Sequence, residues 1–274
     1  METALIVIAC ALLALFILYL IAIAPAKAPL GEPFTTTKYA HRGLHDEKLP
    51  ENSLPAFIAA RDAGFGIELD VRLTKDEVMV VFHDDDLKRM CGKDIRVDAL
   101  TFSELREYTL LDTDVTVPTL AEVLAAVDGK IPLLIEIKED AGNKRVSEKL
   151  ATELQGYAGP YIIESFNPLS LGVIKKLMPS VPRGFLSQRF LKNENKEYHK
   201  PLYFVLENLL LNRIASPAFI AYDISGRDAI TLRIARRLLG AVTVAWTVRS
   251  PEEEAAATSA GFKTIIFENY IPEK

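Results

Sequence analysis

The sequence predicts an α/β protein built as a single (β/α)8 barrel of the TIM type, preceded by one N-terminal transmembrane helix. After residue 38, short apolar runs alternate with segments of helical periodicity, a pattern typical of βα units around a parallel sheet. These units fill residues 38–274, a length close to the ~250 residues of a typical (β/α)8 barrel. The pattern indicates neither an internal repeat nor a second domain.

The amino terminus predicts a membrane anchor. Residues 4–24 carry no charge, Gly or Pro, and as a helix they would span roughly 30 Å, the thickness of a bilayer hydrocarbon core. A cleaved signal peptide is the alternative, because small residues follow the run. The run lacks an initial Lys or Arg, however, and exceeds the roughly 7 to 15 apolar residues usual in a signal peptide.

Residues 25–37 (PAKAPLGEPFTTT) predict a linker, because three prolines, a glycine and a threonine run disfavour regular structure. We therefore expect an anchor over residues 1–24, a linker over 25–37 and a barrel over 38–274. Lys27 and Lys38 follow the apolar run, whereas only Glu2 precedes it. The positive-inside rule then favours a single-pass membrane protein with a cytoplasmic catalytic domain.

Charge and cysteine content exclude two classes of protein. The 32 Lys and Arg against 37 Asp and Glu give a formal net charge of −5, so the chain has no basic field to suggest a nucleic-acid partner. The two cysteines, Cys10 and Cys91, lie in different segments and cannot form a disulfide framework.

Nine apolar runs are strand candidates for the eight places of the barrel. Only residues 72–77 separate the second run from the third, too few for a parallel crossover of about a dozen residues. One of these two runs is therefore expected to be a hairpin arm or an irregular strand. The runs are residues 39–41, 67–71, 78–83, 132–138, 161–166, 184–187, 219–223, 242–248 and 263–268.

Helical periodicity predicts helices between these runs. The polar stretch 84–117 lacks a strong period and predicts an excursion over the barrel mouth with a short helix near residues 102–108. The other candidates are residues 53–63, 119–127, 144–154, 169–176, 227–239 and 251–260.

Acidic residues recur at the carboxyl ends of the runs, where barrel enzymes carry their catalytic groups. Glu68 and Asp70 are two residues apart, so both project from one face of a strand, and Glu136 occupies the same kind of position in IEIK. Three such carboxylates inside a barrel would repel one another unless a cation compensates them. Oxygen ligands suit Mg²⁺, Ca²⁺ or Mn²⁺. A buried ion-pair network with Lys138 is the alternative.

Two of the four histidines end apolar runs. His41 and His83 can serve as general base and general acid beside a metal, or as metal ligands. Arg42 and Lys138 offer the guanidinium fork and the point charge that hold a phosphate. We place His45 and His199 in solvent, because both lie in charged, loop-like sequence. The combination indicates metal-assisted phosphoester chemistry.

An ordered set of motifs, from about residue 39 to near the carboxyl terminus, closely resembles the glycerophosphodiester phosphodiesterase family, in particular its compact bacterial members. The motifs are HRG (41–43), PENS (50–53), AF (56–57), IELDV (67–71), LTKD (73–76), VVFHD (80–84), VPTL (117–120), EVL (122–124), IEIK (135–138), ESFN (164–167) and AWTV (245–248).

The resemblance implies a TIM barrel and assigns roles to individual residues. Glu68, Asp70 and Glu136 match the divalent-metal ligands, and His41 and His83 match the acid and base. The remaining matches are substrate contacts: Arg42 and Lys138 for the phosphate, Glu51 and Asn52 for a loop lining the site, and Trp246 for the wall of the glycerol end.

Some of these positions have ordinary structural alternatives. Asn52 or Ser53 would suit the N-cap of the helix that follows, and Trp246 would suit an apolar core.

The chain departs from the family pattern in two places. GFKTIIFEN (261–269) stands where the family often has a Gly-Val-Asp strand leading to Thr-Asp-x-Pro, and WTVR (246–249) replaces the commoner WTVN. We expect both changes to lie away from the metal and to affect contacts with the substrate end.

The sequence thus predicts a metal-dependent hydrolase that cleaves glycerophosphodiesters to glycerol 3-phosphate and an alcohol. The alternatives are a phospholipase D-like hydrolase of lysophospholipids or sphingolipids, a non-catalytic phosphoester-binding barrel, and a metal-dependent lyase or aldolase. The expected cofactor is a divalent cation. The expected partners are a small glycerophosphodiester or lysolipid and, through the N-terminal helix, a membrane.

Overall fold

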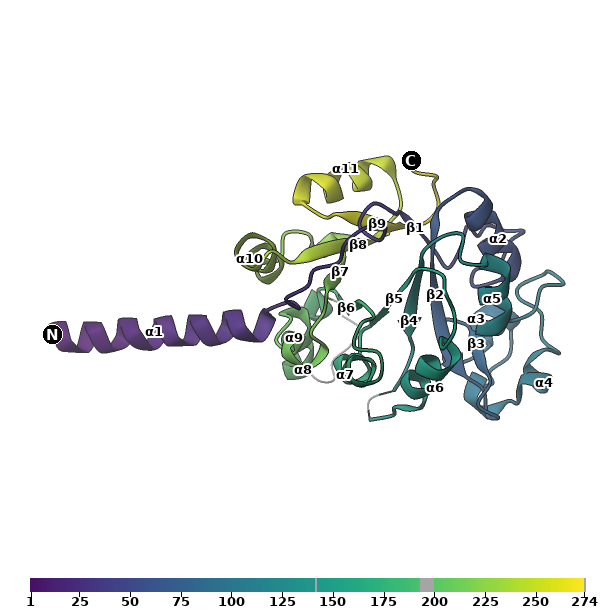
Figure 1. The fold of residues 1–274 in the computed structure, drawn as a ribbon, viewed down its shortest axis with the longest axis horizontal. Helices are drawn as coiled ribbons and strands as arrows, with labels where there is room; N and C mark the ends of the chain where they lie inside the picture. Colours follow the sequence, from purple (N-terminus) through teal and green to yellow (C-terminus); the bar gives the residue numbers. More distant parts are fainter. Residues whose placement is uncertain (141, 193–199, 274) are drawn as a thin grey trace.

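The predicted barrel is confirmed by a computed structural model, which describes residues 1–140, 142–192 and 200–273. Eight parallel strands are hydrogen-bonded in the order β1-β9-β8-β7-β6-β5-β4-β2, and β1 also pairs with β2, which closes the barrel (Figure 1). The strands are β1 (Tyr39–His41), β2 (Gly66–Leu73), β4 (Leu133–Ile137), β5 (Tyr161–Ser165), β6 (Arg183–Ser187), β7 (Phe219–Asp223), β8 (Val242–Val248) and β9 (Thr264–Phe267).

The ninth predicted strand is a hairpin arm, as the short spacing indicated. β3 (Met79–Val81) runs antiparallel to the last residues of β2, with Val71 opposite Val81 and Leu73 opposite Met79. β2 is therefore longer than its neighbours and extends beyond the barrel rim. This extension places His83, just after β3, beside the barrel mouth.

Helices surround the barrel, and the predicted ones begin and end within three residues of expectation. Two further short helices, α8 (Lys200–Glu207) and α9 (Asn212–Ala215), lie between β6 and β7, where no helix was expected. The helices outside the hairpin region are α2 (Leu54–Asp62), α5 (Leu120–Val127), α6 (Arg145–Glu153), α7 (Pro168–Leu177), α8 (Lys200–Glu207), α9 (Asn212–Ala215), α10 (Ile230–Leu239) and α11 (Pro251–Ala260). The excursion after β3 carries α3 (Lys88–Cys91) and α4 (Phe102–Leu105).

Side chains alternate between two apolar layers because successive strand residues point to opposite faces. Ile67, Leu69 and Val71 belong to the layer between the strands and the outer helices. The barrel interior holds a second cluster that includes Leu134 and Ile162. Each of these two interior residues lies two positions before a glutamate in its strand. The interior is therefore apolar at one end and acidic at the carboxyl ends of the strands.

Residues 25–37 contain turns but neither helix nor strand, and they are packed against the barrel. The backbone N–H groups of Ala26 and Leu30 donate to the carbonyls of Pro217 and Ala218, at 2.7 and 3.1 Å. Leu30 is 4% exposed and joins the interior cluster together with Phe34. This segment therefore covers the end of the barrel opposite the acidic residues.

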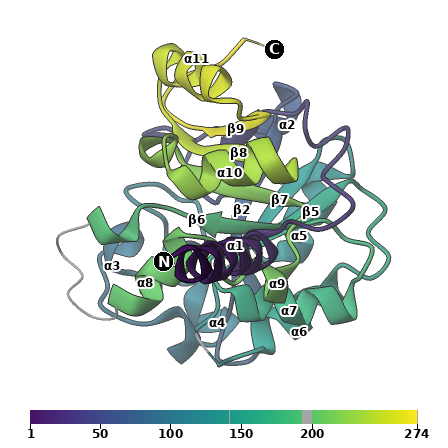
Figure 2. The same cartoon turned by 90° about the vertical axis from the view of Figure 1, so that its left-hand side faces the viewer.

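The N-terminal helix α1 (Glu2–Ile23) projects from the barrel, and only its last turns contact the rest of the chain (Figures 1 and 2). Tyr19 Oη donates to Thr231 Oγ1 of α10 at 2.8 Å, and Asn212 Nδ2 of α9 donates to the carbonyl of Ile23 at 2.8 Å. An 18-residue stretch of the helix has a mean hydropathy of 3.2, so the helix is long and apolar enough to cross a membrane, a property that anchors and signal sequences share.

Candidate active site

Three carboxylates meet at the carboxyl ends of β2 and β4, as the alternation of side chains predicts. Glu68, Asp70 and Glu136 are buried, and one carboxylate oxygen from each lies within 4.8 Å of the others. The strand register explains this proximity, because Asp70 is directly opposite Glu136 in the parallel β2–β4 pair. Three oxygen donors at this separation form a set that fits a divalent cation.

Burial and mutual repulsion disfavour the ionised form of these carboxylates. Burial raises the pKa of Glu68 well above its usual value, and the charges of Asp70 and Glu136 raise it further. Burial also raises the pKa of Glu136. For Asp70, burial is outweighed by nearby cations, chiefly Lys138, and its pKa falls far below the usual value. The negative charges of the three carboxylates therefore require compensation by positive charge nearby, which a bound cation would supply.

Two cationic side chains compensate part of this negative charge. Lys138 Nζ lies 2.7 Å from Glu136 and 3.1 Å from Asp70. Arg42 Nε lies 3.5 Å from Asp70, and the Arg42 backbone N–H donates to Glu68 at 3.0 Å. The ion-pair network weighed as an alternative is thus present, but it holds only two cations.

A further carboxylate, Glu164, enters the same cluster from β5. Its side chain is buried, and Oε2 has no hydrogen-bond partner among the described residues. Burial raises the pKa of Glu164 well above its usual value, and Glu136 and Glu68 raise it further. The four carboxylates therefore outnumber Arg42 and Lys138. The sequence prediction omitted Glu164. In YIIES this residue is two positions after Ile162, which points into the barrel, just as Glu136 is two positions after Leu134.

His41, at the end of β1, is held by a carboxylate that the sequence prediction also missed. Glu268 Oε2 lies 2.5 Å from His41 Nδ1, and Glu268 Oε1 accepts from Arg249 Nε at 2.6 Å. His41 Nε2 faces the acidic cluster, 3.9 Å from Glu68. Burial lowers the pKa of His41, although the bond to Glu268 opposes this shift. The ring is therefore neutral near pH 7.

Glu268 and Arg249 lie in the two segments that depart from the family pattern, which were expected to affect contacts with the substrate end. Arg249 lines the cavity at the barrel mouth, but Glu268 contacts His41 itself. The contact arises because β8 and β9 are neighbours in the barrel and β9 also pairs with β1. β1 is more than 200 residues from β8 and β9 in the sequence, so no local pattern shows that His41 meets Glu268.

The placement of His45 in solvent is also wrong, because the residue is half-buried. Ligand atoms of His45, His41 and Glu268 lie within 4.8 Å of one another. His199 lies outside the described residues.

His83 is held in a similar way on the other side of the mouth. Its Nδ1 lies 2.6 Å from Asp84 Oδ1, and Arg72 donates to its carbonyl at 2.7 and 2.9 Å. Arg89 Nε donates to Asp84 Oδ2 at 2.7 Å. Each histidine therefore has its Nδ1 against a carboxylate.

Residues of the PENS loop (50–53) contact the site and also cap the helix that follows. Asn52 Nδ2 donates to Asp70 at 2.8 Å, while Ser53 Oγ caps α2 by accepting from the Ala56 N–H. Glu51 accepts from Arg42 at 2.6 Å and from Arg89 at 2.7 Å. Asn52 therefore orients a predicted metal ligand, and Glu51 fixes the guanidinium predicted to hold the phosphate.

Aromatic side chains form one wall of the cavity at the barrel mouth, which has a volume of about 180 Å³. Trp246 and Phe166 both line it and pack edge to face, with ring centroids 5.4 Å apart. Trp246 Nε1 has no hydrogen-bond partner among the described residues. The cavity thus has an acidic and basic floor and an apolar wall.

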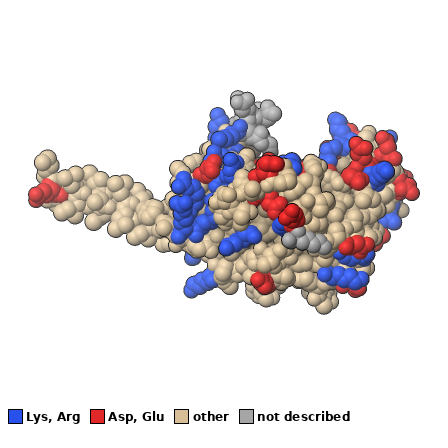
Figure 3. Space-filling model, turned by 90° about the horizontal axis from the view of Figure 1, so that it is seen from above, with Lys and Arg blue, Asp and Glu red and all other residues tan. Residues whose placement is uncertain are grey.

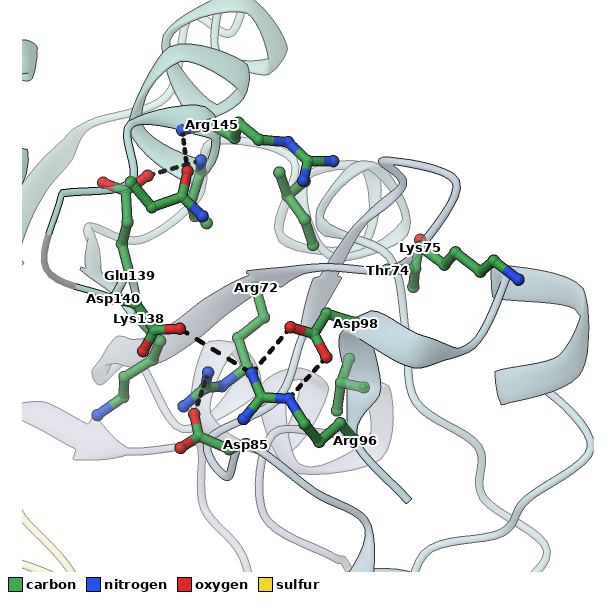
Figure 4. Close-up of a pocket in the computed structure, with 14 residues that line it drawn as sticks. Arg72, Thr74, Lys75, Asp85, Arg96, Asp98, Lys138, Glu139, Asp140 and Arg145 are labelled. Atoms are coloured by element: carbon green, nitrogen blue, oxygen red, sulfur yellow. Dashed lines mark hydrogen bonds and ion pairs between the residues drawn. The ribbon is translucent and has the colours of Figure 1, made fainter.

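A second cavity of about 280 Å³ lies next to the first, and Lys138 lines both. Figure 4 shows that its cations and anions face one another. Arg72 lies 2.6 Å from Asp85, and Arg96 lies 2.8 Å from Asp98. These pairs neutralise much of the charge in the second cavity.

Comparison with known proteins identifies the family. Residues 41–271 match the Glycerophosphoryl diester phosphodiesterase family. The chain is 34% identical to the glycerophosphodiester phosphodiesterase of Caldanaerobacter subterraneus over 56% of this chain and 67% of that protein. It is also 34% identical to the lysophospholipase D of Rattus norvegicus, over 58% of this chain and 54% of the relative.

Solved structures show the same fold. The glycerophosphodiester phosphodiesterase of Thermotoga maritima superposes with a TM-score of 0.66 at 27% identity, covering 84% of this chain and 94% of that one. An Oleispira antarctica phosphodiesterase, solved with the product sn-glycerol-3-phosphate, gives 0.68 at 22% identity, covering 84% and 92%. The match over residues 41–271 and the identity to the Caldanaerobacter subterraneus enzyme show that the chain belongs to the glycerophosphoryl diester phosphodiesterase family and is a hydrolase of glycerophosphodiesters.

Proposed function

We propose that the chain cleaves glycerophosphodiesters to sn-glycerol 3-phosphate and an alcohol, with a divalent cation bound by Glu68, Asp70 and Glu136. The observation that carries this proposal is the convergence of these three buried carboxylates between two histidines. When bound, the cation polarises the phosphate and lowers the pKa of the attacking hydroxyl group. Arg42 and Lys138 hold the phosphate oxygens.

The two histidines take different roles in this proposal, and the lowering of the pKa of His41 by burial supports its role as the base. A carboxylate only accepts hydrogen bonds, so Nδ1 of His41 donates to Glu268 and Nε2 carries the lone pair. His41 therefore removes the proton from the attacking hydroxyl at Nε2, whether that hydroxyl belongs to water or to the substrate glycerol. His83, oriented by Asp84, donates a proton to the oxygen of the leaving alcohol.

A chelation experiment tests this proposal. The full chain is treated with EDTA and then returned to Mg²⁺, Ca²⁺ or Mn²⁺, with glycerophosphocholine as substrate and released glycerol 3-phosphate as the readout. We expect chelation to abolish hydrolysis and one of the cations to restore it. Full activity after complete chelation would contradict the role of the carboxylates as metal ligands.

Hydrolysis of lysophospholipids is the second candidate activity. The similarity to a lysophospholipase D and the apolar helix α1 both favour it. Comparison of glycerophosphocholine with lysophosphatidylcholine as substrates separates the two. A higher kcat/KM for the lysolipid would support this second activity.

We further propose that α1 is a membrane anchor and that the barrel is cytoplasmic. The length and hydropathy of α1 support the anchor, and Lys27 and Lys38 after it support the orientation. Protease protection in membrane vesicles of known orientation tests both statements. Release of the intact barrel into the soluble fraction would instead indicate a cleaved signal peptide.

A further inference from the structure

A cleft beside α10 gathers four arginines that form no ion pair within the part of the chain that the structure describes. The arginine cleft is lined by Arg227, Arg233, Arg236 and Arg237, with Asp228 as its one acidic residue, and has a volume of about 430 Å³. None of these arginines forms an ion pair with a described carboxylate. Because the whole chain has a net charge of −5, this concentration of positive charge is local.

Arg236 is held in place in the cleft, and one of its guanidinium nitrogens has no hydrogen-bond acceptor among the described residues. Its guanidinium lies over the ring of Phe262, 4.9 Å from the centroid, and Nη2 donates to the carbonyl of Arg227 at 3.2 Å. Nη1 is buried and has no partner among the described residues. The guanidinium of Arg236 is therefore held in place without a carboxylate partner among the described residues, and its charge adds to that of the exposed arginines beside it.

The outward face of α10 combines charge with apolar side chains. Arg233 and Arg237 are exposed on it, and Ile230 and Leu238 are 73% and 60% exposed. Basic residues beside exposed apolar residues on one helix are typical of surfaces that lie at a membrane interface.

The position of α1 places this face at the level of lipid headgroups. Tyr19, near the end of α1, is hydrogen-bonded to Thr231 of α10. The part of α1 before Tyr19 is about 25 Å long at 1.5 Å per residue, slightly less than the ~30 Å hydrocarbon core. In a membrane-spanning α1, α10 would therefore lie close to the bilayer surface. Figure 3 shows Lys and Arg gathered where the apolar helix meets the barrel.

We propose that the outward face of α10 and the arginine cleft form a membrane-docking surface that binds the phosphate groups of anionic phospholipids. This inference rests on the proposed anchoring role of α1 and is independent of the catalytic proposal. The docking surface would hold the barrel against the membrane in one orientation, whereas α1 alone would fix only its distance from the membrane.

Lipid binding by the full chain tests the proposal. The protein in neutral dodecyl maltoside micelles is titrated with phosphatidic acid or phosphatidylcholine, and bound lipid is measured by native mass spectrometry. Phosphatidic acid is a suitable probe because, as a phosphomonoester, it offers a phosphodiesterase no diester bond. The double variant Arg233→Gln/Arg237→Gln removes two exposed arginines, and Lys88→Gln/Lys93→Gln removes two exposed lysines at α3, on the far side of the barrel (Figure 1).

We expect the wild type to bind phosphatidic acid more tightly than phosphatidylcholine. The arginine variant should bind phosphatidic acid about 30-fold more weakly, which corresponds to roughly 1 kcal/mol for each basic residue. The lysine variant should bind like the wild type. Both variants should hydrolyse glycerophosphocholine normally, which shows that they are folded.

Three results would overturn the docking surface. These are equal binding of the two lipids by the wild type, unchanged binding by the arginine variant, and equally strong competition by inorganic phosphate, which would indicate a site for a soluble anion. The anchor is tested separately, by whether the full chain sediments with vesicles of pure phosphatidylcholine. Loss of hydrolysis would concern only the catalytic proposal.

Discussion

Glu268 Oε2 lies 2.5 Å from Nδ1 of His41, and Nε2 of the same ring faces the acidic cluster. This contact fixes both the orientation and the tautomer of the histidine, since a carboxylate can only accept the Nδ1 proton. Arg249 holds Glu268 from the other side at 2.6 Å. The residues that replace the usual family motifs in this chain therefore act together on one histidine.

Removal of Glu268 should lower the rate and shift its pH dependence. We expect Glu268→Ala to reduce kcat about 10- to 100-fold with little change in KM, because the neutral ring loses its preferred tautomer. Glu268 raises the pKa of His41, so the acidic limb of the kcat/KM profile should move to lower pH in the variant. Glu268→Gln, which keeps a hydrogen-bond acceptor, should retain more activity. An acidic limb that stays in place would contradict the pairing.

Each histidine of the pair should be required for turnover. We expect His41→Ala and His83→Ala each to lower kcat by about 10² to 10⁴, the usual contribution of a general acid or base. His45→Ala is the comparison variant, because His45 lies beside His41 and Glu268 but outside β1 and has no assigned role. Steady-state hydrolysis of glycerophosphocholine measures all three. Near-normal turnover in both His41 and His83 variants would refute the acid/base assignment.

Lys138 should stabilise the metal-free protein more than the metal-loaded one. Lys138→Met leaves Asp70 and Glu136 without their closest cation, and removal of one partner of a buried ion pair costs about 3–5 kcal/mol. A divalent cation would replace part of the missing charge. We therefore expect the loss in unfolding free energy to be larger in EDTA than with excess Mg²⁺ or Mn²⁺, as measured by urea denaturation. An equal loss under both conditions would argue against a cation at this position.

Leu30 should contribute to barrel stability although it precedes the first strand. Its side chain is buried in the interior cluster, so Leu30→Ala should lower the free energy of unfolding by about 2–5 kcal/mol. Lys27→Ala, at an exposed position of the same segment, should change it by less than about 0.5 kcal/mol. If the two variants are equally stable, residues 25–37 form a linker that does not support the barrel.

Some features of the fold and site follow from local sequence. The two-residue spacing of Glu68 and Asp70 puts both carboxylates on one strand face, and IEIK does the same for Glu136 and Lys138. The short connection 72–77 excluded a parallel crossover, and β3 is indeed antiparallel. In each case the deciding geometry spans only a few residues, so the pattern can be recognised without knowledge of the tertiary structure.

Other features depend on which strands become neighbours. Glu268 meets His41 only because β9 pairs with β1 to close the barrel, and Leu30 fills the barrel only because the chain passes beneath it. Helix α10 lies against the last turns of α1 only because Tyr19 is hydrogen-bonded to Thr231. The local sequence is enough to predict the barrel, the three carboxylates and the two histidines. Only the folded chain shows that Glu268 holds His41 and where the barrel lies relative to α1, because these contacts join residues more than 200 positions apart. Asp84, which holds His83, is instead its neighbour in the sequence.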